Sequence, residues 1–204
     1  MKRITILVIL ISLFTLLAGC NSDKEEKQKY IEQVKSINEK ILSSSTVSEK
    51  VINSYSKIWL EAIENGITLE KFAELLDTTN TNVNTIYSAH HMGVGLLEDN
   101  EYSKVEDFNE AITIAETHYK KTGDIETINS ARASIQSAIK EIALPPEEYQ
   151  SIYNELFELY KNYEKYVDLA IDPSGSLQSY TSKAQSLSPE IVSGVKAVSA
   201  RLPQ

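Results

Sequence analysis

The chain has 204 residues and is acidic, with 20 lysine and arginine residues against 29 aspartate and glutamate residues, a net charge of −9. This balance argues against nucleic acid as a partner and against electrostatic docking on anionic lipid headgroups, because both need a positive surface. A single cysteine excludes an intramolecular disulfide, so we expect the fold to depend on a packed core.

The first twenty residues have the organisation of an export signal. Lys2 and Arg3 form a basic start, and an apolar run of 15 residues follows from Ile4 to Ala18. This run is shorter than the roughly 20 apolar residues that a membrane-spanning helix needs. It therefore favours a secretory signal that is removed after export.

The residues Leu17-Ala18-Gly19-Cys20 resemble the lipobox of bacterial lipoproteins, and polar residues follow directly. The resemblance implies that a diacylglycerol is attached to the Cys20 thiol and that residues 1–19 are removed as a signal peptide. Two acyl chains anchor a protein stably, whereas one holds it only marginally. We therefore expect the membrane to be a partner through this anchor, on the outer face of the cell membrane. The composition and the motif together favour a Gram-positive host.

Removal of residues 1–19 leaves a mature chain of 185 residues with a net charge of −11, because Lys2 and Arg3 are lost. Residues 20–28 are predicted to be the lipidated cysteine and a polar tether. Residues 29–204 are predicted to form a single α-helical domain, since this length can bury one sizeable core.

Apolar residues recur at helical spacing from residue 30 onward, and no sustained alternation predicts a sheet. A first helix is interrupted at Ser43–Ser45, and Thr46 with Glu49 has the spacing of a capping box that begins a second helix. The two segments could also form one kinked rod. Asn65-Gly66 is predicted to end the second helix, because glycine readily takes the left-handed cap conformation.

A third helix is predicted from the N-cap Thr68 through about 30 residues to Leu97, although the stretch 77–85 is poor in helix formers. Glycine and proline then mark the later boundaries, with Gly123 ending a helix and Pro189 beginning the last one. The later helices are predicted at 103–121, 124–142, 145–171, 177–187 and 189–201.

The predicted connections are mostly two to six residues long, which favours antiparallel neighbours. The expected fold is therefore all-α, an antiparallel bundle of about six to eight helices. A short solenoid of helical hairpins is the alternative.

The three histidines do not form a metal-binding pattern. His90 and His91 are adjacent and would point about 100° apart on a helix, and no Glu-x-x-His or cysteine pair is present. His90 continues the apolar face of the third helix, so we predict a buried histidine there and a surface position for His91. We expect no metal and no other cofactor.

Two short motifs match those of penicillin-binding enzymes. Ser54 and Lys57 fit S-x-x-K, and residues 121–123 fit K-T-G. No S-D-N lies between them, and both fall on or at the end of predicted helices, whereas that family is partly β-sheet. We interpret both matches as chance.

Paired acidic residues supply an alternative function. They occur at Glu98-Asp99, Glu106-Asp107 and Glu147-Glu148, and two carboxylates can hydrolyse glycosides. Acidic side chains near helix starts also interact favourably with the helix dipole. We prefer this structural interpretation and expect no catalytic residues.

Five tyrosines within 18 positions of the predicted sixth helix are the strongest functional lead. They are Tyr149, Tyr153, Tyr160, Tyr163 and Tyr166. Tyrosine combines a large rigid area with a polar tip and is enriched in recognition surfaces, although it also lies at the rim of helical cores. We prefer the interpretation that these tyrosines lie at the rim of a helical core, and the alternative is that this face, together with the turn at 172–176, binds a partner.

The sequence therefore predicts a non-catalytic extracytoplasmic lipoprotein that binds or assists another envelope component, a protein or a glycan. Two alternatives stay open. One is a cell-wall hydrolase that uses paired carboxylates, and the other is an immunity or exclusion lipoprotein against a toxin or phage.

Overall fold

The computed structural model describes residues 2–93, 95–98 and 103–203, with side chains from Asp23 onward within these ranges. This part of the chain is all-α, as the sequence predicted. The helices are α1 (Lys2–Glu64), α2 (Leu69–Leu75), α3 (Asn80–His90), α4 (Phe108–Thr122), α5 (Asp124–Glu141), α6 (Gln150–Ile171) and α7 (Leu177–Arg201). A 3-10 turn, η1 (Glu147–Tyr149), precedes α6, and two short strands, β1 (Ile67–Thr68) and β2 (Lys104–Val105), complete the elements.

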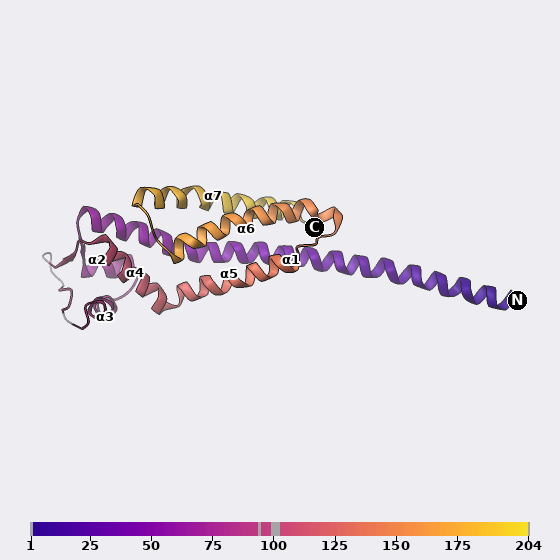
Figure 1. Ribbon diagram of the computed structural model, residues 1–204, viewed down its shortest axis with the longest axis horizontal. Coiled ribbons are helices and arrows are strands. Elements are labelled where there is room, and N and C mark those ends of the chain that lie inside the picture. The colour runs from indigo at the N-terminus through magenta and orange to yellow at the C-terminus, as the bar shows by residue number, and fades with distance from the viewer. Residues whose placement is uncertain (1, 94, 99–102, 204) are drawn as a thin grey trace.

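The helix α1 is the central element of the bundle. It packs against α4, α5, α6 and α7, and α6 and α7 also pack against each other. Figure 1 shows these helices lying along α1, whose N-terminal end projects beyond them, while α2 and α3 gather at the opposite end. One helix therefore contacts most of the others, which is the arrangement of a bundle and not of a hairpin solenoid.

The helix α1 passes without a break through the predicted interruption at Ser43–Ser45. Thr46 does not cap a helix: its hydroxyl donates to the Leu42 carbonyl at 3.0 Å. Ser48 likewise donates to the Ser44 carbonyl at 3.0 Å. Serine and threonine satisfy their hydroxyls on the preceding turn inside a helix, and their small size suits the crowded face that α1 presents to its neighbours.

The predicted polar tether is also part of α1. Residues 23–28 are helical, and Lys27 forms a 2.9 Å ion pair with Glu148 in η1. Lysine, glutamate and glutamine are good helix formers. A polar composition at this point therefore marks an exposed stretch of helix and not its beginning.

The predicted third helix is wrong, because it is divided into α2 and α3. Thr68 does cap α2, accepting from the Lys71 N–H at 3.3 Å. Asp77 then takes a left-handed conformation with φ of 50°, and Thr79 caps α3 by accepting from the Asn82 N–H. Threonine and asparagine favour caps over helix interiors. The chain therefore ends one helix and begins another at this point, although the apolar residues keep helical spacing across it.

A two-stranded sheet is present where none was expected. Ile67 and Thr68 pair antiparallel with Val105 and Lys104. Gly66, with φ of 69°, makes the preceding turn, and a Cβ there would lie 3.2 Å from side-chain atoms of Lys104. Because 104–105 belong to this sheet, α4 begins at Phe108 and not near Ser103 as predicted.

The two short helices predicted at the C-terminus form one helix, α7, which contains Pro189 in its interior. Proline lacks an N–H, so the helix loses one backbone bond there without ending. Gly123 behaves as predicted: with φ of 83° it ends α4 and leads directly into α5.

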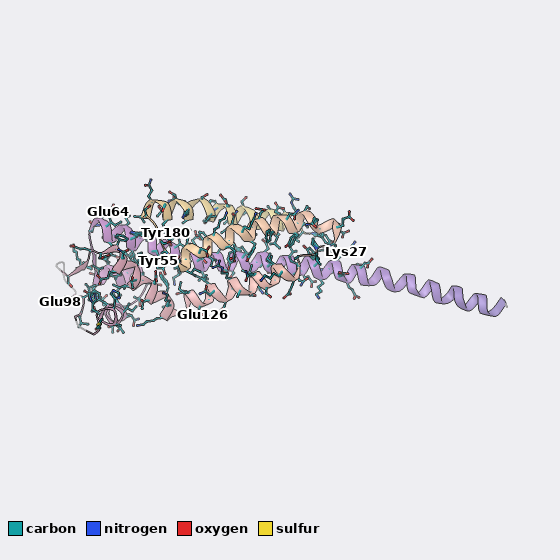
Figure 2. All side chains as sticks on the ribbon, viewed as in Figure 1. Lys27, Tyr55, Glu64, Glu98, Glu126 and Tyr180 are labelled. Atoms are coloured by element: carbon teal, nitrogen blue, oxygen red, sulfur yellow. The ribbon has the colours of Figure 1, made fainter. Side chains whose placement is uncertain are left out.

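The buried apolar side chains form one continuous cluster with several tyrosines at its centre. Tyr55 on α1 and Tyr180 on α7 are fully buried, and Figure 2 shows both towards the end of the bundle that carries Glu64 and Glu98. Trp59 lies between helices, with its ring 5.6 Å from Phe108 and 5.8 Å from Tyr180. These aromatic contacts join α1, α4 and α7.

Candidate functional site

Two of the five tyrosines proposed as a binding face lie in the core. Tyr163 is 0% exposed and Tyr166 is 2% exposed. The Tyr163 hydroxyl lies 2.9 Å from the Ser44 hydroxyl, and this buried hydrogen bond joins α6 to α1. The expectation that these two residues contact a partner is therefore corrected, because the apolar stripe of α6 includes them.

The other three tyrosines are half-buried at the edge of the core. Tyr149 stacks on Tyr30 of α1, with ring centroids 5.6 Å apart and planes at 5°. This stack and the Lys27–Glu148 ion pair place the beginning of α6 beside the α1 segment that starts at Lys27. Tyr153 and Tyr160 lie further along α6.

A short row of aromatic rings, which we call the aromatic ridge, consists of Tyr153, Phe157 and Tyr160. The Phe157 ring lies 6.0 Å from each tyrosine ring, and its side chain is 38% exposed. The Lys161 ammonium lies 5.9 Å from the Phe157 ring centroid, a cation–π contact. Phe157 was not among the residues expected from the sequence, although its spacing from both tyrosines places it on their face.

An ion-pair network fixes α6 against α5 beside this ridge. Arg132 of α5 donates to Glu164 at 2.7 and 2.9 Å and pairs with Asp168 at 2.9 Å. The hydrogen bond to Glu164 is the main cause that raises the pKa of Arg132. Burial, followed by the charge of Glu164, raises the pKa of Tyr160 and favours its neutral hydroxyl. The aromatic ridge therefore belongs to a helix, α6, that is fixed to its neighbours by ion pairs as well as by apolar packing.

A groove of about 830 Å³ lies between α6 and α7, beside the turn at 172–176. Its apolar lining comes from Leu169, Ile171 and Leu187. Its charged lining comes from Lys165, Asp168, Asp172, Lys183 and Glu190. The volume lies in the range of about 300–1,000 Å³ that is typical of ligand sites. The turn-rich break that follows the tyrosine-rich helix in the sequence therefore does border a cavity.

The histidines differ from expectation. His90 is exposed, because α3 ends there and the apolar rhythm does not continue. His91 is half-buried, with Nε2 2.7 Å from a Glu110 carboxylate oxygen. The buried histidine is His118, whose pKa is lowered mainly by burial. Among the described side chains, no group of three or more histidine, cysteine, aspartate or glutamate residues is placed to hold a metal ion.

The paired acidic residues lie at the beginnings of elements or in the loop before β2. The Asp107 carboxylate caps α4, accepting from the N–H groups of Asn109 at 2.8 Å and Glu110 at 3.4 Å. Glu148 lies in η1, paired with Lys27. Glu98 precedes β2, whereas Asp99 lies outside the described residues.

Cys20 lies within α1, but its side chain is outside the described residues, as are the side chains of the predicted signal peptide 1–19. Among helices with described side chains, none combines the length and apolar content that crossing a membrane requires.

Comparisons with protein-family models, curated proteins and solved structures give no match to this chain.

Proposed function

We propose that this protein is an extracytoplasmic lipoprotein, anchored to the outer face of the cell membrane through Cys20, that binds another envelope component with its aromatic ridge. The observation that carries the proposal is the partial exposure of Phe157, whose ring stacks with that of Tyr153 and is tilted by 38° to that of Tyr160. The Lys161 ammonium lies over the same ring. Aromatic residues are enriched in the anchors of protein interfaces. The proposed role is binding and not catalysis.

The position of the ridge supports a partner close to the membrane. Tyr149, one turn before the ridge, stacks on Tyr30, and Tyr30 is ten residues beyond the proposed anchor at Cys20. A helix rises about 1.5 Å per residue, so Tyr30 lies about 15 Å along α1 from Cys20. Ser44, which hydrogen-bonds Tyr163 just after the ridge, lies about 36 Å from Cys20, and the ridge falls between these two positions. We therefore expect the partner to be the extracytoplasmic part of a membrane-associated protein and not a distant wall glycan.

The anchor is tested by the substitution Cys20→Ser in the native host. Without the thiol no diacylglycerol is attached, so the variant should appear in the medium or as unprocessed precursor, and it should incorporate no labelled palmitate. Fractionation and labelling measure both effects. Labelling of the variant at the level of the unchanged chain would contradict lipidation at Cys20.

The binding surface is tested by a photo-crosslinking amino acid placed at Phe157 in living cells, followed by mass spectrometry. We expect one dominant crosslinked protein that is absent when the crosslinker replaces Lys196, an exposed residue of α7. Equal crosslinking from both positions would contradict a specific ridge. An incoming toxin or phage protein as the captured partner would instead identify the immunity or exclusion alternative.

A further inference from the structure

A second site lies apart from the aromatic ridge, where α1, the end of α2 and α4 meet around a cavity of about 310 Å³. We propose that this cavity binds a small zwitterion, a free amino acid or a short peptide that carries both an ammonium and a carboxylate group. The proposal does not depend on the proposed function of the ridge. The volume lies at the lower end of the range of about 300–1,000 Å³ for ligand sites, which suits a molecule of this size.

The wall formed by α1 is cationic. Lys50, Ser54 and Lys57 line the cavity, and their spacing of four and three residues places them on one face of the helix. Both lysines are exposed, and among the described residues neither forms an ion pair, as is also true of most other lysines of the chain. Their placement on one face of α1 puts two ammonium groups at the same cavity, where both can donate charge-assisted hydrogen bonds to a ligand carboxylate.

The wall formed by the end of α2 is anionic. Glu74 is occupied by an ion pair with Lys71 at 2.8 Å, which leaves Asp77 as the acidic group of this wall without an ion pair among the described residues. The backbone of Asp77 has a left-handed conformation, with φ of 50°. Its N–H donates to the Glu74 carbonyl at 3.2 Å, and this hydrogen bond fixes the residue at the end of α2. This carboxylate is the predicted partner of the ligand ammonium.

Buried polar groups join the two walls and fix their spacing. The Ser54 hydroxyl donates to the Leu75 carbonyl at 3.0 Å and ties α1 to the end of α2. Tyr119 of α4, which is 1% exposed, also lines the cavity. Ser54 and Lys57 are the residues of the S-x-x-K match in the sequence. They lie in one cavity, but residues 121–123 are not part of its lining.

The proposal is tested by calorimetric titration of the full-length chain, purified in detergent, with dialanine and two blocked forms of it. N-acetyl-dialanine lacks the ammonium, and dialanine amide lacks the carboxylate. Hydrogen bonds to charged groups contribute about 1.5–3 kcal/mol, so each blocked form should bind at least about tenfold more weakly than dialanine. No heat of binding with dialanine, or equal affinity for all three compounds, overturns the proposal.

Three variants assign the two charges to the two walls. Lys57→Met should weaken dialanine about tenfold and leave the affinity for dialanine amide unchanged. Asp77→Asn, which keeps a residue tolerant of a left-handed conformation, should weaken dialanine and leave N-acetyl-dialanine unchanged. Lys35→Met is the matched control, since Lys35 is an exposed lysine of α1 outside the cavity. Unchanged dialanine affinity in both cavity variants, or equal weakening in the control, overturns the assignment.

Discussion

The aromatic residues of α6 have different roles because they lie on different sides of the helix. Tyr163 faces α1 and donates or accepts a hydrogen bond with Ser44 inside the core, whereas Phe157 is partly exposed on the ridge. The residue type does not distinguish the two environments, since tyrosine serves as well in a core rim as in an interface. Their contribution to stability does distinguish them.

We expect Tyr163→Ser to lower the free energy of unfolding by about 3–5 kcal/mol, because it leaves a large cavity in the core. Phe157→Ser should cost less than about 1 kcal/mol, because substitutions at partly exposed positions disturb packing little. Chemical denaturation of both variants measures the difference. A loss at Phe157 as large as that at Tyr163 would show that the ridge is part of the core and not a free surface.

At the scale of elements, caps and breaks decided where helices end. Thr68 and Gly123 behave as their residue types predict, because a threonine oxygen accepts an N–H bond and glycine takes a positive φ at little cost. Ser43–Ser45 and Pro189 were misleading, since neighbouring helices stabilise α1 and α7 by packing against them. The boundaries at Thr68 and Gly123 were therefore predictable from local residue types, whereas the local cap at Thr79 was missed and the continuity of α1 and α7 depends on tertiary packing.

The Asp107 cap provides a test at this scale. Asp107→Ala removes the carboxylate that accepts from two N–H groups at the start of α4 and should lower the free energy of unfolding by about 1 kcal/mol. Asp107→Asn keeps an accepting oxygen and should cost much less. Thermal unfolding followed by circular dichroism compares the two. Equal losses would show that the charge, and not the capping bond, is what matters.

At the scale of the whole molecule, the core is built around neutral tyrosines. Burial raises the pKa of Tyr30 and of Tyr166 to about 12, and it also raises those of Tyr55 and Tyr180. In the unfolded chain a tyrosine titrates near 10. Above about pH 10 the unfolded chain therefore releases protons that the folded chain retains, and ionisation favours unfolding.

We expect the free energy of unfolding to fall steeply as the pH rises above about 10. Below that value the tyrosines are neutral in both the folded and the unfolded chain, so their ionisation causes no loss of stability. The part of the tyrosinate absorbance that comes from the buried tyrosines should increase together with the loss of helical circular dichroism, because these groups ionise when the core opens. Tyr166→Phe removes one such group and should make the fall shallower. Gradual ionisation of all 11 tyrosines in a chain that stays helical would contradict this account.

The site was less predictable than the fold. Periodicity placed five tyrosines on one helix, but it did not show which of them α1 would cover, because that depends on how α6 is rotated against its neighbours. The cavity beside Ser54 was also hidden, since it combines residues from α1, α2 and α4 that are far apart in the sequence. The S-x-x-K match at Ser54 and Lys57 marked two residues of the cavity lining, but this motif is typical of penicillin-binding enzymes and not of a binding cavity.

The unbroken course of α1 sets how the molecule stands on a membrane. If Cys20 carries the lipid, the 44 helical steps from Cys20 to Glu64 correspond to about 66 Å. A continuous helix has no hinge at which the far end could turn independently of the base. A partner that tilts the molecule at the aromatic ridge would therefore move the end that carries α2 and α3 by a larger distance. A small change of angle near the bilayer would then change which neighbouring molecules that distant end can contact.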